Sequence, residues 1–320
     1  MELSNTRGQA TAPSNSLPQL MRRHPLVSYF VLTYGLSWLC WLPFVLSQSG
    51  VGLLPFNLSP FSLVPGVFLG PCFSGFLMTA VVGGKAGMLR FLKRFIDWRV
   101  GLQWYLFVLL GIPAFWLLGA LALPGVLPAL TLTSLTAALL GYPSLLLLTF
   151  LIDGGGEEPG WRGFALPRLQ VHYGPLLGTL IPGVLWASWH LPLFLTTAQA
   201  GGPGVSLLTD LWHFVLYVPS TVFEAIIITW VFNNTRGSML IAMLIHGVGD
   251  AAPLPASLLP VLNSLYSNFR GFALAILLVN GIIALLLIIL TRGRLSYERY
   301  QREVIPPYSS GGGEASTSGV

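Results

Sequence analysis

Charged side chains are scarce in this sequence. Asp, Glu, Lys and Arg together make up only 8% of its 320 residues, whereas about a quarter is usual in soluble globular proteins. Hydrophobic residues account for 54% of the chain, and its mean hydropathy is +0.73. This composition excludes an ordinary soluble domain, because there is too little charge to cover a surface that faces water.

Several other sequence features are missing. Polar and apolar residues do not alternate within the apolar stretches, so a membrane-spanning β-barrel is excluded. The HExxH motif of zinc proteases is absent, and no internal repeat indicates a transporter built from inverted repeats. The two cysteines are Cys40 and Cys72. We expect them to be buried free thiols rather than a disulfide or a metal site.

Long apolar runs are what the sequence has in abundance. Several continuous, leucine-rich stretches of about 20 residues are each long enough for a transmembrane helix. The sequence therefore predicts an all-α fold, a polytopic membrane helical bundle with about eight transmembrane helices. The predicted spans are residues 26–46, 62–82, 104–123, 132–152, 175–198, 207–232, 238–250 and 272–290.

The basic residues indicate how this bundle is oriented. The formal net charge is +5, and with a cytoplasmic N-terminus every Lys and Arg except Arg270 falls on the cytoplasmic side. Because cytoplasmic loops of membrane proteins carry the excess of Lys and Arg, we expect both the N- and C-termini to be cytoplasmic. The basic balance thus reflects membrane topology, and no nucleic-acid partner is expected.

Three regions follow one another along the chain. Residues 1–24 are polar and are expected to form a disordered cytoplasmic N-terminus, before a first span that is retained as an anchor. Residues 25–292 form the predicted transmembrane domain, and residues 293–320 form a cytoplasmic tail with a Gly/Ser-rich end. Within the domain, residues 85–101 predict an amphipathic helix on the anionic cytoplasmic leaflet, with a partner-binding helix as the alternative.

A pair of carboxylates interrupts the apolar sequence in the stretch DGGGEEPGWR. An ionised side chain at membrane depth costs at least about 2.5 kcal/mol unless it is paired or hydrated, so each one is a candidate for function. If the stretch is helical, Glu158 and Arg162 lie four residues apart and form an ion pair. Glu157 then points about 100° away and can face a cavity. The alternative is a solvated cytoplasmic loop.

Two further stretches place ionisable side chains in predicted spans. His190 lies deep in the fifth span, in WASWH, where the alternative to a functional role is a satisfied core histidine. His246 and Asp250 are four residues apart in HGVGD, so the carboxylate can fix the tautomer of the ring or share a water or a metal with it. Two imidazoles and a carboxylate suffice to activate a water molecule, with or without a metal. Glu224 lies in mid-span and either lines a substrate cavity or forms a structural bridge.

The three stretches together resemble a known family of membrane proteases. EEPGWR fits an EExxxR motif, WASWH fits an aromatic-xxxH motif and HGVGD fits an HxxxN/D motif, in the same order and spacing. These are the motifs of the CAAX-protease and bacteriocin-processing intramembrane endopeptidase family (CPBP, also called Abi). The resemblance covers about residues 60–255, with a motif core at about 130–255, and the residues flanking the motifs are typical of bacterial members.

The resemblance implies a role for each residue of the first two motifs. Glu157 would be the general base that activates water, and Glu158 with Arg162 would hold that segment in place. His190 would bind the same water or a metal. Trp186 stands where the family often has Phe, and it would keep an aromatic wall for the substrate cavity, to which Glu224 is a further candidate.

The resemblance also implies that the third motif binds the oxyanion or a metal. His246 with Asp250 would stabilise the oxyanion or complete the polar site. Asp250 replaces the more frequent Asn, and an additional carboxylate would strengthen metal binding. The resemblance leaves open zinc or another divalent metal, with Glu157, His190 and His246 as its ligands, and a metal-free glutamate mechanism.

The function expected from these observations is that of an intramembrane endopeptidase in a cell membrane, the inner membrane of a bacterium. Its partners would be the lipid bilayer and a membrane-associated peptide or protein substrate. Two alternatives stay open: a catalytically silent membrane scaffold or bacteriocin-immunity factor, and a transporter that uses the same polar residues. The intact Glu157, His190 and His246 favour the enzyme.

Overall fold

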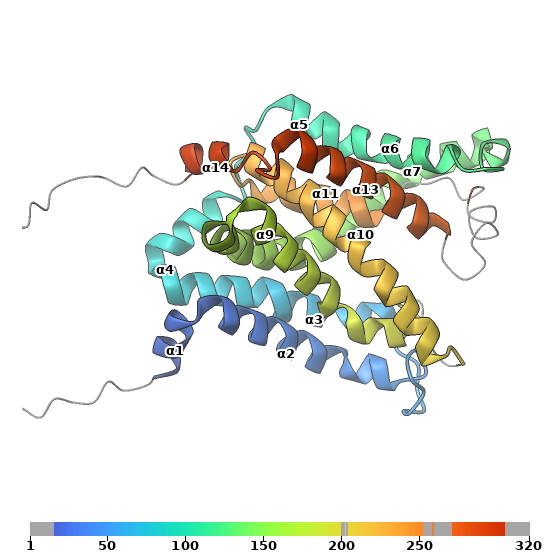
Figure 1. The fold of residues 1–320 in the computed structure, drawn as a ribbon. Coiled ribbons are helices and arrows are strands. Elements are labelled where there is room, and N and C mark those ends of the chain that lie inside the picture. Colours follow the sequence, from blue (N-terminus) through green and yellow to red (C-terminus); the bar gives the residue numbers. More distant parts are fainter. Residues whose placement is uncertain (1–15, 200–201, 203, 252–257, 259–270, 305–320) are drawn as a thin grey trace, which may run out of the picture.

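Every regular element of the protein is a helix in the part of the chain that the structure describes (Figure 1). This structure is a computed structural model, and it describes residues 16–199, 202, 204–251, 258 and 271–304. The first half of the chain forms α1 (Leu17–Arg23), α2 (Pro25–Leu46), η1 (Pro60–Leu63), α3 (Val64–Val67), η2 (Phe68–Cys72), α4 (Phe73–Lys93), α5 (Leu102–Leu106), η3 (Phe107–Gly111), α6 (Ile112–Leu121), η4 (Leu127–Ala129) and α7 (Leu132–Thr149). The second half forms η5 (Phe150–Gly154), α8 (Gly155–Glu158), η6 (Pro159–Ala165), α9 (Leu166–Trp189), η7 (Leu191–Leu195), α10 (Leu207–Asn234), α11 (Met239–Ala251), α13 (Gly271–Thr291) and α14 (Tyr297–Val304). The predicted all-α class is confirmed.

The helices turn apolar side chains outward and small polar ones inward. In α2, Thr33 and Ser37 are fully buried, whereas Leu39 is 70% exposed. A helix on the surface of a soluble protein shows the opposite distribution, so this exposed apolar surface suits lipid. Cys40 and Cys72 are free thiols, and they are half-buried rather than buried as predicted.

Over the described residues, five helical stretches are long and apolar enough to cross a membrane, by length and composition. They are Pro25–Leu46, Pro60–Lys93, Leu102–Leu121, Leu132–Leu195 and Leu207–Asn234. Two shorter apolar helices, Met239–Ala251 and Ile276–Thr291, coincide with the last two predicted spans. The chain is therefore built as a multi-pass membrane protein, while the count of eight crossings and the cytoplasmic termini stay predictions.

The longest stretch, Leu132–Leu195, contains two predicted spans and the carboxylate pair. An unbroken α-helix of this length would measure about 95 Å, roughly three times the hydrocarbon core of a bilayer. The chain instead changes direction at Gly174, whose φ of 75° is readily adopted only by glycine. It also widens into π-helical turns in η5 and η6, on either side of α8. The carboxylate pair thus lies in a locally widened helix, a feature common at functional sites.

Helix α10 lies within the bundle and packs against both α9 and α13 (Figure 1). Its side chains Ile226, Ile228 and Val231 belong to the main apolar cluster of buried residues. Helix α11 packs against α7 and η5. These contacts bring the three motif-bearing segments, α8 with η6, the end of α9, and α11, to one interior region.

The N-terminal region is more ordered than predicted. Residues 17–23, inside the stretch expected to be disordered, form α1, and Arg22 Nε donates to the carbonyl of Val81 at 2.8 Å. Pro18 favours a helix start, because its missing N–H is not needed in the first turn. Residues 1–15 of the predicted disordered segment lie outside the described residues.

The predicted amphipathic helix over residues 85–101 is shorter than expected, because α4 ends at Lys93. The residues that follow interact with the turn after α10 instead of continuing the hydrogen bonding of α4. Asp97 pairs with Arg236 at 2.9 Å, and the hydroxyl of Ser238 donates to the backbone carbonyl of Asp97 at 2.7 Å. These tertiary contacts replace the intrahelical bonds that a longer helix would need.

The predicted C-terminal tail, residues 293–320, begins with a docked helix. Helix α14 packs against α10, and the ring of Tyr300 lies 5.5 Å from that of Phe232. Tyr297 and Tyr300 are both buried. The first part of the tail is therefore part of the folded bundle, and the Gly/Ser-rich end lies outside the described residues.

Candidate active site

The carboxylate pair lies where several backbone segments approach closely. A Cβ atom on Gly160 would overlap the hydroxyl of Tyr29 and the carbonyl of Pro71, and one on Gly247 would overlap the backbone of Phe150. Glycine at these two positions therefore lets η6 contact α2 and η2, and lets α11 contact η5. The close approach places the ionisable side chains of separate helices within hydrogen-bond distance.

Glu158 is the centre of a buried chain of charged groups. Its Oε1 accepts a hydrogen bond from Arg162 Nη1 at 2.7 Å and lies 2.6 Å from Nδ1 of His246. Nε2 of His246 lies 3.1 Å from Oδ2 of Asp250, whose side chain is 47% exposed. Both pairs expected from helical spacing are present, Glu158 with Arg162 and His246 with Asp250. Glu158 joins them into one chain across two helices.

Glu157 points away from this chain, as its place one residue earlier predicts. Its Oε2 accepts a hydrogen bond from the indole Nε1 of Trp186 at 2.5 Å. The same indole lies under the guanidinium of Arg162, with 4.3 Å from Cζ to the ring centre. It also lies 5.1 Å from the ring of His246. Trp186 thus fixes one oxygen of Glu157 and leaves Oε1 to face a ligand.

His190 is oriented by its own helix and by α10. Its Nδ1 lies 3.0 Å from the backbone carbonyl of Trp186, which can only accept a hydrogen bond. In the neutral ring Nδ1 therefore carries the proton, and Nε2 carries the lone pair. The hydroxyl of Tyr217 lies 3.3 Å from the same Nδ1. The ring is held from one side, with Nε2 as the nitrogen able to bind water.

An open cavity of about 660 Å³ brings most of the predicted site residues together. Its wall includes the four residues expected to react or to bind the oxyanion, which are Glu157, His190, His246 and Asp250. It also includes the two predicted cavity residues, Trp186 and Glu224. Asp153 lines the cavity as well. Glu158 and Arg162 are not among its lining residues and support its wall from behind.

Beside the predicted Glu224, two further polar residues of α10 and one residue of α13 line the cavity, and these three were not predicted. Tyr217, Ser220 and Glu224 all line the cavity, and their spacing of three and four residues places them on one side of the helix. Asn280 lines it from α13, and its Oδ1 accepts a hydrogen bond from the indole of Trp116 at 2.9 Å. The helical spacing of Tyr217 and Ser220 with Glu224 could have indicated these two residues as cavity-lining. No local pattern marks Asn280.

The three predicted metal ligands, Glu157, His190 and His246, all line this cavity. Among the residues that the structure describes, no three His, Cys, Asp or Glu side chains have an arrangement that could hold a metal. The predicted ligand set of Glu157, His190 and His246 does not form such a group. Nδ1 of His246 lies against Glu158 and Nε2 lies against Asp250, so a metal at Nε2 would have to take the place of the Asp250 contact.

The Trp186→Phe substitution separates the indole hydrogen bond from aromatic packing. The Phe ring keeps the aromatic wall, but Glu157 loses the donor that holds its Oε2. A hydrogen bond to a charged group contributes about 1.5–3 kcal/mol, so we expect kcat of any hydrolytic reaction to fall about tenfold with little change in KM. Steady-state kinetics on the purified variant measures this. An unchanged kcat would mean that the indole donor has no part in orienting Glu157.

Comparison with known proteins agrees with this geometry. A family model described as Type II CAAX prenyl endopeptidase Rce1-like matches residues 139–252. The chain is also similar to a CAAX prenyl protease 2 of Methanococcus maripaludis, with 31% identity over 104 residues, which are 32% of this chain and 37% of that protein. The chain thus spans little more than a third of the length of the relative it matches. All three motifs lie inside the matched region, in keeping with the resemblance to the CPBP family.

Proposed function

We propose that this protein is an intramembrane endopeptidase that hydrolyses a peptide bond of a membrane-associated substrate. The observation that carries the proposal is the cavity within the helical bundle, where Glu157 and His190 face the same space. A carboxylate oriented through one oxygen beside an imidazole with an available lone pair is a suitable arrangement for activating water. The surrounding apolar side chains would keep bulk water away from the reacting groups.

The reaction follows from the orientation of these groups. Oε1 of Glu157 takes a proton from a water molecule while the water oxygen attacks the carbonyl carbon of the substrate. Nε2 of His190 accepts a hydrogen bond from the second O–H of that water, which stays bonded to the attacking oxygen, and so fixes the position of the water. As the tetrahedral intermediate collapses and the C–N bond breaks, Glu157 returns the proton to the leaving nitrogen. One water molecule is thereby divided between the new carboxyl and amino ends.

His246 is the donor proposed for the developing oxyanion. Its two nitrogens face carboxylates, so this position suits a ring that donates at both. Asp250 is half exposed at the cavity edge, and the substrate oxygen can take its place at Nε2. Glu158 and Arg162 would hold the imidazole through Nδ1, so that the donor is already oriented before the substrate enters.

The substrate class is proposed from the matched proteins, which are named for CAAX prenyl tails. We propose a membrane-anchored peptide with a CAAX-type end as the first substrate to examine, and the plasma membrane of a bacterial cell as the site of action. The purified protein in proteoliposomes should release the C-terminal peptide from a prenylated CAAX reporter. Mass spectrometry of the products identifies the cleaved bond, with an unprenylated reporter for comparison. A complete lack of cleavage of both reporters would favour the silent-scaffold alternative.

The same assay tests the metal-free mechanism that the donor geometry favours. We expect cleavage to persist after dialysis against a strong chelator, and elemental analysis to find less than one equivalent of bound metal per chain. Loss of activity in the chelator with recovery on adding zinc would overturn this proposal. In that case Nε2 of His246 would bind the metal in place of its contact with Asp250, while Nδ1 stays against Glu158.

A further inference from the structure

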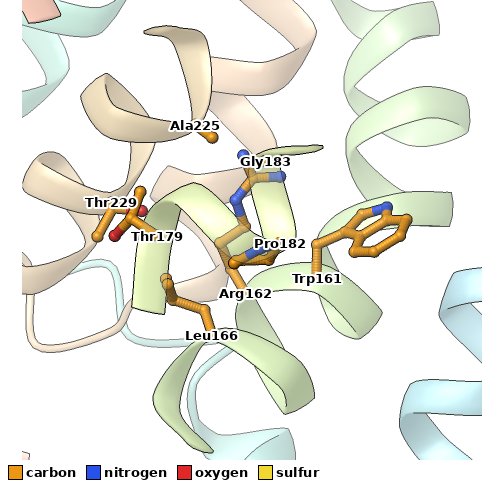
Figure 2. Close-up of a pocket in the computed structure, with 8 residues that line it drawn as sticks. All are labelled: Trp161, Arg162, Leu166, Thr179, Pro182, Gly183, Ala225 and Thr229. Atoms are coloured by element: carbon orange, nitrogen blue, oxygen red, sulfur yellow. The ribbon is translucent and has the colours of Figure 1, made fainter. Parts of the chain in front are cut away.

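A small internal void lies on the far side of Arg162 from Glu158. Its walls come from η6, α9 and α10, and Figure 2 shows the guanidinium directed between Gly183 and Ala225, with Thr179 and Thr229 nearby. The void has about 10 Å³ of space for the centre of a water-sized sphere. That is close to the room needed for a single water molecule. The void is separate from the catalytic cavity, with which it shares none of its lining residues.

Arg162 has a donor that no side chain or carbonyl uses. Nη1 donates to Glu158, and the face of the guanidinium rests on Trp186. Nη2 is buried and has no hydrogen-bond partner among the described residues. Only 3% of Arg162 is exposed, so bulk water cannot satisfy that group. A buried donor on a charged side chain left without a partner is strongly unfavourable.

The other walls of the void supply acceptors. Thr229 is 1% exposed and lines the void from α10. Thr179 donates its hydroxyl proton to the carbonyl of Pro175, which leaves its oxygen able to accept. Two hydroxyl oxygens thus line a space that has one strong donor.

We propose that this void is a built site for one ordered water molecule, which accepts from Nη2 of Arg162 and donates to the hydroxyl oxygen of Thr229. The water completes the hydrogen bonding of Arg162 and connects η6 to α10. Its second proton is available to the hydroxyl oxygen of Thr179. Thr229 is then a positioning residue, because it acts on Glu158 and His246 only through the water and Arg162. This last step rests on the proposed function, whereas the water site does not.

Two substitutions at one position test the proposal. Thr229→Val keeps the shape of the side chain and removes its hydroxyl, whereas Thr229→Ser keeps the hydroxyl. Wild type and both variants would be compared by experimental structure determination at a resolution that shows ordered water, and by cleavage kinetics in proteoliposomes. We expect density for one water beside Nη2 in wild type and Thr229→Ser, and weakened or missing density in Thr229→Val.

The kinetics distinguish positioning from a general structural effect. Loss of one hydrogen bond corresponds to about a fivefold lower kcat, so Thr229→Val should show this change with KM unaltered, and Thr229→Ser should recover most of it. Absence of the water in the wild-type map would overturn the site. Equal kcat in all three proteins, with the water present, would overturn the positioning role. If the density gives an anomalous signal after bromide exchange, the bound species is a halide and not water. This outcome would also overturn the site. If wild type cleaves no substrate, the proposed function fails. The density map then still decides whether the water is bound.

Discussion

Glu157→Gln is expected to abolish proteolysis and leave the fold intact. The amide has the shape of the carboxylate, and its oxygen can still accept the indole hydrogen bond from Trp186. It cannot take a proton from water at neutral pH. General-base catalysis by one side chain contributes about 10²–10⁴-fold, so kcat should fall by that factor. Initial cleavage rates in proteoliposomes, with a thermal unfolding curve for each preparation, provide the measurement.

The matched control for this variant is Asp153→Asn. Asp153 also lines the cavity and lies four residues before Glu157, so the substitution removes a similar carboxylate from the same space. We expect its kcat to stay within a few-fold of wild type. Equal losses in the two variants would attribute the effect to the charge of the cavity. Near-normal cleavage by Glu157→Gln would exclude Glu157 as the base.

Glu158→Ala should act on stability instead. Glu158 is fully buried, and its Oε1 interacts with both Arg162 and His246. Removing it leaves a buried guanidinium without its counter-ion, which typically costs about 3–5 kcal/mol. We expect a large fall in the thermal midpoint in detergent and a low yield of folded protein. Activity per folded molecule should fall as well, because Nδ1 of His246 loses its acceptor.

Two controls show whether burial causes this loss. The Arg294 and Glu298 side chains form a pair with the same four-residue spacing at 2.9 Å, but both are largely exposed. Glu298→Ala should cost less than about 1 kcal/mol. The double variant Glu158→Ala/Arg162→Met, which removes both members of the buried pair, should be more stable than Glu158→Ala alone. A double variant less stable than Glu158→Ala would contradict the uncompensated charge as the cause.

These two glutamates show which parts of the site are readable from sequence. The pairs of Glu158 with Arg162 and of His246 with Asp250 could be predicted, because each pair is four residues apart on one helix. The contact between Glu158 and His246 could not. It joins residues 88 positions apart, and hydrophobic periodicity does not say which helix faces meet. A single amino-acid sequence contains no other information about that contact.

The fold was predictable to a similar depth. Long apolar runs without alternation predicted helices, because a closed barrel is the only other structure that satisfies the backbone within lipid and it needs alternating residues. The ends of elements were not predictable where tertiary contacts decide them. Residues 94–101 carry a helical pattern, yet Asp97 bonds to Arg236 and Ser238 and the helix stops before it. The π-helical turns around α8 also have no counterpart in the periodicity of a uniform helix.

Those π-helical turns make chain length as important as residue identity. Glu157, Glu158 and Arg162 lie in backbone that is helical without a break from Leu132 to the kink at Gly174, so no loop in this stretch is present to absorb an added or deleted residue. Each single-residue change in length would rotate the residues between it and the kink by about 100°. Arg162 would then leave Glu158, and its other donor would leave the void behind it. Evolution can therefore exchange side chains in this segment more easily than it can change the number of residues between them.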